Sequence, residues 1–399
     1  MEMKKYKLGE IADFVEERIS SEDISLDEYV TTDSLLQNKK GRVMAQNLPP
    51  KKCSLTYYKK GDVLIGNIRP YLKKIWLADT SGGCSQDVLV LRSKKDSDSE
   101  FLYATLMQDD FFDYVMKATK GSKMPRGDKN HIMHFICFDV KNKNKIGELF
   151  SSLDKKIALN SRINARLEQM AKRLYEHYFV QFDFPAEDGK PYKTSGGKMV
   201  YSSELKREIP EGWEVKRLGD ILKNNIEVTD AGEHLKGLKY CPIDEIPMKT
   251  MSFANGKPYT EANSSLQLYK RKDILIGAMR VYFHRCCIAS EPGITRTTTI
   301  VVSPKNKNFL SYVYQVCNED KTFDYAIKVS NGTQQPYVTW KSLKEYQFVY
   351  PKDEKIIEGF CKNTNSIIDR ILENVQESAR LTSLRDRLLP LLMNGQVSV

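Results

Sequence analysis

Two long segments of the chain carry apolar residues at the three- and four-residue spacing that is typical of an amphipathic helix. The first extends from Ile146 to Phe182 and the second from Ile356 to Met393. Glycine and proline occur only near the ends of these segments, so each is predicted to form one continuous helix of roughly 50 Å at 1.5 Å per residue. The apolar stripe of the first helix consists of Ile146, Leu149, Leu153, Ile157, Ile163, Leu167, Met170, Leu174 and Tyr178.

The two helical segments superpose on one another with a constant shift. This shift places Met170 on Leu384 and Asn160 on Asn374. Because a helix with one narrow apolar stripe needs a partner, we expect the two copies to pair as an antiparallel coiled coil. Asn160 and Asn374 would then meet across the seam and fix its register at some expense of stability. The alternatives are that each helix packs on its own domain and that both asparagines point to solvent.

The duplication extends beyond the helices, so the whole chain is two copies of one unit. Lys7–Ile11 reappears as Arg217–Ile221, and GDVLIGNIRPYLKKIWLAD from Gly61 recurs as KDILIGAMRVYFHRCCIAS from Lys272. Gly121–Pro125 likewise matches Gly332–Pro336. The predicted segments are a first domain (1–144), a first long helix (145–182), a linker rich in proline, glycine and serine (183–213), a second domain (214–352) and a second long helix (353–395).

Each domain is predicted to mix strands and helices. Residues 62–68 and 87–91 are expected to form buried strands, with 273–279 and 298–302 as their counterparts. Residues 100–118 and 309–329 are expected to be helical. The predicted fold class is therefore α+β, with two pseudo-symmetric mixed α/β domains and two long antiparallel coiled-coil helices.

Composition and charge exclude few classes of function. The 399 residues carry a formal net charge of +10 and a pI of about 8.9, which favours an acidic partner such as nucleic acid but also suits a lysine-rich surface. The eight cysteines include no C-x-x-C pair, so we expect free, mostly buried thiols in a reducing cytoplasm. Neither a signal peptide nor a membrane span is predicted, and the expected location is cytoplasmic.

Sequence motifs for catalysis are absent. The chain has no G-x-x-x-x-G-K-[ST], no glycine-rich dinucleotide turn and no H-E-x-x-H. His131 and His134 form H-x-x-H, but no third ligand is suggested, so no metal site is predicted. The chain is expected to bind rather than to catalyse. The alternative is a catalytic site assembled from residues that are distant in sequence.

Two matching loops and two matching arginines are the candidate DNA contacts. The loop Lys117–Lys129 is strongly basic, and Lys328–Lys341 carries glutamines that suit adenine edges. Arg69 and Arg280 each precede a tyrosine by two residues. The alternatives are solvated turns for the loops, and for the arginines a carboxylate partner beside a tyrosine packed in the core. The candidate DNA-binding residues are Arg69, Lys73, Lys74, Lys120, Lys123, Arg126, Lys129, Arg280, Arg296, Thr333, Gln334, Gln335 and Tyr337.

Four stretches of the chain carry a family resemblance: LDKKIALNSRINARLEQMAKRLYEHYFVQFDFP from Leu153, GKPYKTSGGKMVYSSELKREIPEGWEVKRLGDI from Gly189, NGTQQPYVTW from Asn331 and LRDRLLPLLMNGQVSV from Leu384. They give the sequence a resemblance to the specificity (S) subunit of type I restriction-modification systems. It implies a non-catalytic subunit whose two target-recognition domains bind double-stranded DNA. It also implies two adenine methyltransferase subunits on the helices and ATP-driven restriction subunits, so that S-adenosylmethionine, ATP and Mg²⁺ belong to those partners and none to this chain.

The predicted antiparallel helices also yield an expectation about target geometry. Domains held at opposite ends of a rod of roughly 50 Å, against roughly 34–36 Å for one duplex turn, imply two half-sites separated by several unread base pairs. Two other functions are open at this point. One is a stand-alone sequence-specific DNA-binding regulator on the same duplicated frame, and the other is a nuclease or methyltransferase with an unrecognised site.

Overall fold

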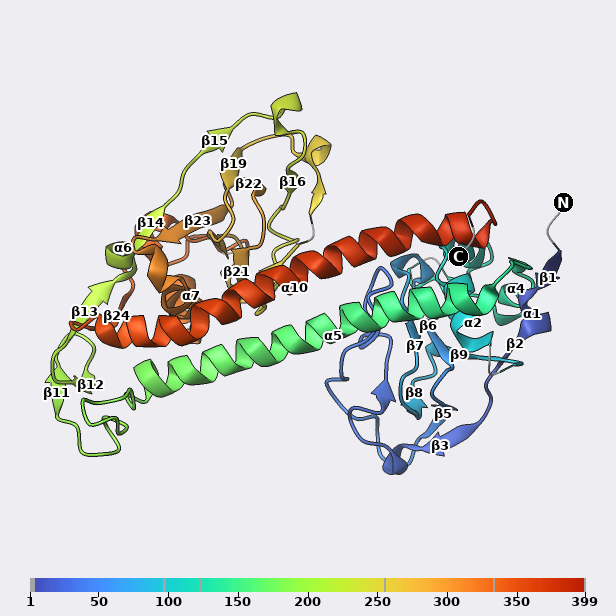
Figure 1. Cartoon of the computed structure of the whole chain (residues 1–399), viewed down its shortest axis with the longest axis horizontal. Coiled ribbons are helices and arrows are strands. Elements are labelled where there is room, and N and C mark those ends of the chain that lie inside the picture. Colours follow the sequence, from blue (N-terminus) through green and yellow to red (C-terminus); the bar gives the residue numbers. More distant parts are fainter. Residues whose placement is uncertain (1–3, 96–97, 122, 255, 333, 398–399) are drawn as a thin grey trace. The chain divides into compact units, whose positions relative to one another are not determined.

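The two copies of the repeat fold into the same order of elements, as the computed structural model shows for residues 4–95, 98–121, 123–254, 256–332 and 334–397 (Figure 1). The residues divide into two units. Unit 1 consists of Met1–Ala158 with Arg380–Val399, and unit 2 of Leu159–Ala379. Each unit therefore contains one domain and a segment of both long helices, so that the units are not the two sequence repeats.

Unit 1 contains two four-stranded sheets. The first has the order β2 (Ala12–Phe14), β9 (Val88–Ser93), β6 (Val63–Gly66) and β7 (Ile75–Leu77), and all its neighbours are antiparallel. The second has the order β3 (Arg18–Ser20), β5 (Ser54–Tyr58), β8 (Gly82–Cys84) and β4 (Tyr29–Val30), with β4 and β8 parallel. A separate pair joins β1 (Lys5–Lys7) to β10 (Ile136–Phe138).

Unit 2 repeats these sheets and adds an edge strand to each. The first has the order β14 (Leu222–Asn224), β23 (Thr299–Pro304), β20 (Ile274–Gly277), β21 (Cys286–Ala289) and β17 (Ser252–Phe253). The second has the order β15 (Val228–Thr229), β19 (Leu266–Tyr269), β22 (Gly293–Arg296), β16 (Lys239–Tyr240) and β18 (Lys257–Pro258). The expected buried strands are confirmed, because β6, β9, β20 and β23 occupy the predicted positions and are almost wholly buried.

The helical stretch predicted after these strands is broken into two helices in both units. Unit 1 has α2 (Ser99–Leu106) and α3 (Asp109–Met116), and unit 2 has α7 (Leu310–Asn318) and α8 (Asp320–Lys328). An extended residue precedes α3 and α8, and each of these helices begins with an aspartate. Aspartate favours a helix N-terminus because its charge complements the helix dipole, so the break is encoded locally.

The shortest helices and one of the strand pairs flank the domains. Four-residue helices occur at α1 (Leu8–Ile11) and α4 (Lys129–Ile132) in unit 1, and at α6 (Leu218–Ile221) and α9 (Trp340–Leu343) in unit 2. In unit 2, β13 (Trp213–Arg217) pairs antiparallel with β24 (Gln347–Pro351), as β1 does with β10.

Both predicted long helices are present. The first is α5 (Lys143–Tyr175), which continues as a π-helical turn at Glu176–Val180, and the second is α10 (Lys355–Met393). In unit 1, Ile146 and Phe150 near the start of α5 share one buried cluster with Leu389 and Leu392 near the end of α10. In unit 2 the order is reversed, because Phe179 packs on Phe360 at 5.3 Å between ring centroids. The helices are therefore antiparallel within each unit, as expected.

The apolar seam of the helices differs from the predicted one in one symmetric pair. Met170 and Leu384, which the duplication superposes, are 59% and 45% exposed, so their assignment to the seam is wrong. Spacing alone placed these two side chains in the stripe, and a helix of 3.6 residues per turn rotates a strict heptad position away from the contact.

Asn160 and Asn374 are buried in the helix contact of unit 2, so the solvent-facing alternative is wrong. They do not bond to one another, which corrects the expected pairing. The Asn160 side-chain amide donates to Glu377 Oε2 (2.7 Å) and Ser378 Oγ (3.2 Å). The Asn374 amide donates to Asn164 Oδ1 (2.8 Å). Each asparagine thus contacts a residue about one turn from the other asparagine.

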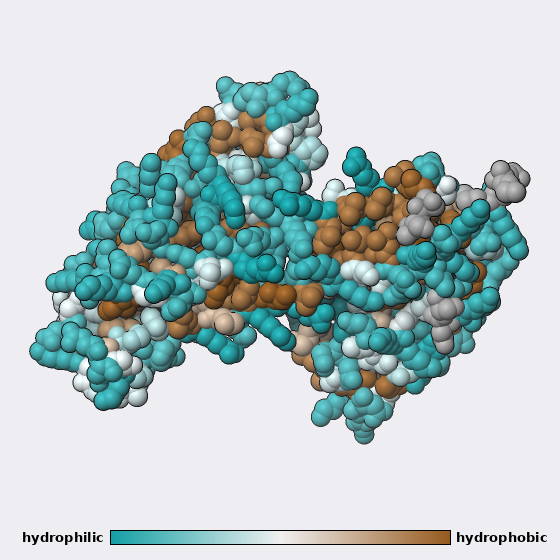
Figure 2. Space-filling model, viewed as in Figure 1, coloured by the Kyte–Doolittle hydropathy of each residue, from teal (hydrophilic) through white to brown (hydrophobic). Residues whose placement is uncertain are grey.

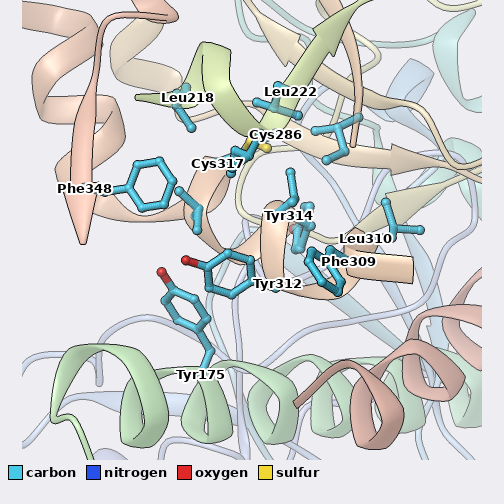
Figure 3. Packing of buried hydrophobic residues seen from close by; sticks show 14 of the residues in the cluster. Tyr175, Leu218, Leu222, Cys286, Phe309, Leu310, Tyr312, Tyr314, Cys317 and Phe348 are labelled. Atoms are coloured by element: carbon cyan, nitrogen blue, oxygen red, sulfur yellow. The ribbon is translucent and has the colours of Figure 1, made fainter. Parts of the chain in front are cut away.

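The core of unit 2 joins the domain to α5. Tyr175 of α5 points toward Tyr312 of α7, with 6.0 Å between the ring centroids (Figure 3). Cys286, Cys317 and Phe348 belong to the same buried cluster. All eight cysteines are free and seven of them are buried, which confirms the prediction from the cysteine pattern.

The segment 183–213, predicted as a linker, is folded in unit 2. It contains a hairpin of β11 (Met199–Ser202) and β12 (Arg207–Pro210). Phe184 and Trp213 are buried, with 5.2 Å between their ring centroids. Aromatic side chains at its ends attach this proline- and glycine-rich segment to the core, whereas its composition alone predicted a linker.

The surface of the molecule is largely hydrophilic on the face drawn in Figure 2, with apolar residues visible between the polar ones. The mean hydropathy of the chain is −0.49. In the part of the chain that the structure describes, no helix combines the length and the apolar content needed to cross a bilayer.

Candidate nucleic-acid interface

A tight turn follows the central buried strand of each domain, and we call it the tip. Tip 1 is Arg69–Lys73, after β6, and tip 2 is Arg280–His284, after β20; each contains one turn of 3₁₀-helix. The first and last residues of both tips have left-handed backbones, with φ of 52° and 50° in tip 1 and 51° and 49° in tip 2. This conformation is uncommon for residues other than glycine, so two such positions fix each turn in an unusual shape.

Each tip is bonded to the matching candidate loop. The Arg69 N–H donates to the Pro125 carbonyl oxygen (2.8 Å), and the Arg280 N–H donates to the Pro336 carbonyl oxygen (2.7 Å). The structure therefore brings together, in each unit, the arginine and the loop that the sequence nominated separately.

The arginine and tyrosine side chains of the tips are exposed to solvent. Arg69 and Arg280 are exposed, and Tyr71 and Tyr282 are 50% and 53% exposed. Within the described residues neither arginine forms an ion pair with a carboxylate. The alternative that assigned the arginine to a carboxylate and the tyrosine to the core is therefore wrong for both copies. These two tyrosines were not among the predicted DNA contacts, although their repetition at the same place in both copies was the available signal.

The basic residues of the first loop differ in how far they are neutralised. Lys120 pairs with Asp128 (2.8 Å), and this lysine lowers the pKa of the Asp128 carboxyl to about 2. Arg126 pairs with Asp87 (2.9 Å), yet its side chain remains 58% exposed. Lys123 is exposed.

Lys129 also lies at this loop, where its ammonium group is 5.5 Å from the centre of the Phe14 ring. Lys120, Arg126 and Lys129 therefore already contact groups of their own unit. Lys123 forms no such contact with the described residues and presents its charge to solvent, which makes it the strongest phosphate candidate among these four.

The second loop presents polar and aromatic groups where the first is basic. Gln334 and Gln335 are exposed, and Tyr337 is 46% exposed. Thr333 lies outside the described residues. By the repeat, Gln334, Gln335 and Tyr337 stand where unit 1 has Lys123, Met124 and Arg126. The two loops thus share a backbone and differ in the chemistry that they expose.

Three other candidates are committed to their own unit. Lys74 is buried, and its ammonium group donates to the Thr32 carbonyl oxygen, which removes it from the candidate interface. Lys73 is 27% exposed and pairs with Asp109 at 2.8 Å. Lys74 points into the domain because Lys73, the left-handed residue that ends tip 1, turns the chain after it back toward the domain. Arg296, at the end of β22, is half-buried and its guanidinium donates to Ser264 Oγ (3.4 Å).

In each unit a lysine and an aspartate contact the last residue of the tip and hold the tip in place. The Lys39 N–H donates to the Lys73 carbonyl oxygen (2.9 Å), and the Lys39 ammonium pairs with Asp109 (3.0 Å). In unit 2 the Lys249 N–H donates to the His284 carbonyl oxygen (3.2 Å), and Asp320 lies 3.8 Å from Lys249 and 3.4 Å from His284. Lys39 and Lys249 also have left-handed backbones, with φ of 60° and 52°.

The anchors differ in charge between the units. Burial opposes ionisation of Asp109, but hydrogen bonds from Lys73 and Lys39 hold the pKa of this carboxyl below its ordinary value. In unit 2, burial lowers the pKa of His284, although Asn318 and Asp320 act in the opposite direction. The last residue of tip 1, Lys73, therefore contacts its aspartate as a charged lysine. The last residue of tip 2, His284, does so as a histidine that favours its neutral form at neutral pH.

In each unit a residue of a long helix bonds to the backbone at or near the lysine that holds the tip, Lys39 in unit 1 and Lys249 in unit 2. In unit 1, Arg385 of α10 donates to the Lys39 carbonyl oxygen (3.0 Å). In unit 2, Glu168 of α5 accepts a hydrogen bond from the Met251 N–H (3.1 Å), two residues beyond Lys249. Burial raises the pKa of Glu168 to about 7. Each domain is thus tied to the helix that follows the other domain in the sequence.

The H-x-x-H pair is used within unit 1. The His131 ring bonds to the Tyr114 carbonyl oxygen (3.2 Å) and stacks on the Tyr114 ring, and the His134 ring bonds to the Asn130 carbonyl oxygen (2.8 Å). Among the described residues, no three His, Cys, Asp or Glu side chains gather as a set that could hold a metal ion.

Comparisons with known proteins place these features in a family. The sequence matches the family model described as type I restriction modification DNA specificity domain over residues 1–169 and again over 210–383. It is 24% identical over 366 residues to the type I restriction enzyme MjaIX specificity subunit of Methanocaldococcus jannaschii, covering 88% of this chain and 80% of that protein. It is 24% identical over 466 residues to the type I restriction enzyme HindI specificity subunit of Haemophilus influenzae, covering 99% of each.

A solved structure shares the fold. The crystal structure of the type I restriction-modification system S subunit from M. genitalium superposes with a TM-score of 0.60 at 14% sequence identity, covering 98% of this chain and 96% of that one. The two segments that match the family model, 1–169 and 210–383, contain the two tips and their loops.

Proposed function

This chain belongs to the family of type I restriction modification DNA specificity domains, and from that premise we propose how it selects its target. It is a non-catalytic DNA specificity subunit that recognises a bipartite DNA target. The observation that carries this function is the occurrence of the specificity domain twice, over residues 1–169 and 210–383.

Each domain would read one half-site through its tip and loop. Lys123 and Arg126 suit phosphates and guanine edges, whereas Gln334 and Gln335 suit adenine edges in the major groove. Because the exposed groups differ between the loops, the two half-sites are expected to differ in sequence. Arg69 and Arg280 would contact DNA in both.

The partners follow from the class of complex. Two adenine methyltransferase subunits would bind the long helices, and restriction subunits would join for cleavage. S-adenosylmethionine, ATP and Mg²⁺ would be bound by these partners and not by this chain. The complex would act in the cytoplasm.

The test combines binding and capture. Adenine methylation mapped in the source genome would define the target, and the purified chain should bind a duplex that contains this target more tightly than one in which a single half is scrambled. The chain should also capture a methyltransferase subunit from an extract of the source organism. Methylation or cleavage of DNA by the purified chain alone would reject the specificity-subunit function, and failure to bind DNA would reject target recognition.

A further inference from the structure

The exposed tyrosines of the tips are not explained by base recognition. Tyr71 and Tyr282 lie at the same place in two domains whose loops expose different chemistry. Across the two copies, Arg69, Tyr71 and Pro125 recur as Arg280, Tyr282 and Pro336, whereas the three exposed loop positions beside them change in every case. A group that reads one particular base has no reason to recur in a domain that reads a different half-site.

We propose that the two tips are sequence-independent DNA clamps, in which the arginine and tyrosine bind the phosphodiester backbone in the same way at both half-sites. This inference rests on the proposed DNA-binding function and deepens it. Contacts to phosphate and sugar position a protein on the duplex, whereas contacts to base edges carry the sequence information. The tips would fix the position from which each loop meets the bases.

The backbone of the tip is suited to such positioning. Two left-handed residues end each turn, and the amide of the first donates to the proline of the loop. Non-glycine residues in this conformation are unfavourable unless the surroundings hold them, and such residues concentrate at functional sites. The hydrogen bond from Arg69 to Pro125 makes the loop move with the tip, so that a clamp at the tip orients the loop.

The charges around the tip favour a polyanion as its ligand. The inner cation Lys73 is already paired with Asp109, while Arg69 points outward and exposed. An arginine guanidinium and a tyrosine hydroxyl both donate hydrogen bonds to phosphate oxygens, and the tyrosine ring covers the adjacent sugar. The net charge of +10 further favours DNA over an apolar protein partner.

The experiment compares a target duplex, defined by methylation mapping, with a duplex of the same length and unrelated sequence. The full chain carries R69A with Y71A, R280A with Y282A, or all four substitutions. We expect the variants of a single tip to bind both duplexes about tenfold more weakly, and the variant of both tips about a hundredfold, because each tip loses hydrogen bonds to charged groups. The ratio of the two affinities should stay the same within a factor of about two, and the slope of log affinity against log salt should fall by about one per arginine removed.

Three control substitutions distinguish a backbone clamp from a base contact and from a general loss of surface tyrosine. Tyr201→Ala removes an exposed tyrosine from the β11–β12 hairpin and should change nothing. Tyr71→Phe keeps the ring and should recover part of the affinity. Gln335→Ala should change the ratio between the duplexes and leave binding to unrelated DNA unaltered. Thermal unfolding of each variant identifies losses that come from misfolding.

Two outcomes would overturn the clamp while leaving the proposed function intact. In the first, the tip variants weaken binding to the target alone, which would make the tips base readers. In the second, they bind both duplexes as the wild type does, with or without losing the methyltransferase subunit. Failure of the wild-type chain to bind either duplex would instead reject the DNA-binding function itself.

Discussion

Arg385 Nη1 lies 2.7 Å from Asp154 Oδ1 between α10 and α5 in unit 1, and the side chain of Arg385 is only 2% exposed. The repeat places Ala171 and Ile368 at the corresponding positions of unit 2, where both belong to the apolar core. The same position in the helix contact is therefore occupied by an ion pair in unit 1 and by apolar side chains in unit 2. The carboxylates of Asp154 and Asp386 raise the pKa of Arg385 even though its burial acts to lower it.

We predict that Arg385→Met destabilises unit 1 strongly. The substitution removes the cation beside the half-buried Asp154 and takes from the Lys39 carbonyl oxygen the donor that Arg385 supplies, and removal of one partner of a buried pair costs about 3–5 kcal/mol. Hydrogen exchange of α10 and of strands in unit 1 would measure the loss. Arg387→Met, an exposed arginine on the same helix, is the matched control. Equal protection in the two variants would contradict the prediction.

A second substitution should recover part of this loss. Asp154→Ile, introduced together with Arg385→Met, brings the apolar contact of unit 2 into unit 1. Replacement of a whole buried ion pair by apolar residues is often neutral or stabilising, so the double variant should be more stable than Arg385→Met alone. The Tyr103 hydroxyl, which donates to Asp154 (2.6 Å), would lose its acceptor, so full recovery is not expected. Additive losses in the double variant would show that the unpaired aspartate is not the cause of the instability.

The stability of unit 2 should depend on pH through Glu168. Its pKa in the folded state is about 7, raised by burial from an ordinary value of 4.5. The folded state therefore holds this proton more tightly than the unfolded state, so the stabilisation present below pH 4.5 is lost as pH rises through 7.

Glu168→Gln is predicted to remove this dependence while it keeps an oxygen acceptor for the Met251 N–H. At pH 8 it should stabilise unit 2 by on the order of 1–3 kcal/mol, since one pKa unit corresponds to about 1.4 kcal/mol. At pH 4.5 the variant and the wild type should unfold alike. Denaturant unfolding at several pH values measures the difference, and Glu208→Gln, an exposed glutamate, serves as the control. A pH-independent difference would count against the titration of Glu168.

Two lysines of unit 1 should affect different properties, one DNA binding and the other stability. Lys123→Ala is expected to lower the slope of log affinity against log salt by about one, because an exposed phosphate contact is lost. Lys74→Met should leave this slope unchanged and lower the stability of unit 1, because its ammonium group holds the Thr32 carbonyl oxygen inside the domain. Salt titrations of DNA binding and thermal unfolding of both variants test this contrast, which fails if Lys74→Met changes the salt slope.

The glutamines of the second loop should act on specificity. Gln334→Ala or Gln335→Ala is predicted to relax discrimination at one position of one half-site, by about 1–3 kcal/mol if the contact is bidentate. Competition with duplexes that carry single base changes across the target would locate that position. An equal loss on every sequence would assign the loop to the DNA backbone instead.

The strands and the duplication were predictable because the sequence signals them twice. The runs around β6 and β20 are continuously apolar, bounded by turns and repeated at one shift, which leaves little choice of structure. The helix break at Asp109 was missed because the apolar spacing continues across it, whereas the aspartate that begins the new helix is a single-residue signal. The exposure of Met170 was missed because spacing cannot fix which edge of a stripe faces the partner.

The candidate site was only partly predictable for a related reason. Arg69 and the first loop were found as separate features, and only the hydrogen bond between Arg69 and Pro125 joins them. Lys74 looked equivalent to its neighbours in sequence, yet the left-handed backbone of Lys73 turns it inward. Backbone handedness at single residues depends on tertiary contacts, so the direction of these side chains was beyond the sequence pattern.

The composition of the two units also implies an order of completion during synthesis. Unit 2 is one continuous stretch, Leu159–Ala379, whereas unit 1 joins its beginning to Arg380–Val399. The ribosome therefore delivers all of unit 2 before the segment that covers Ile146 and Phe150 with Leu389 and Leu392 has been made. The domain that is translated first is therefore the last to complete its core, because part of its apolar surface stays uncovered until the end of α10 has been synthesised. During that interval this apolar surface of unit 1 is uncovered, and transiently exposed apolar surface is prone to aggregation.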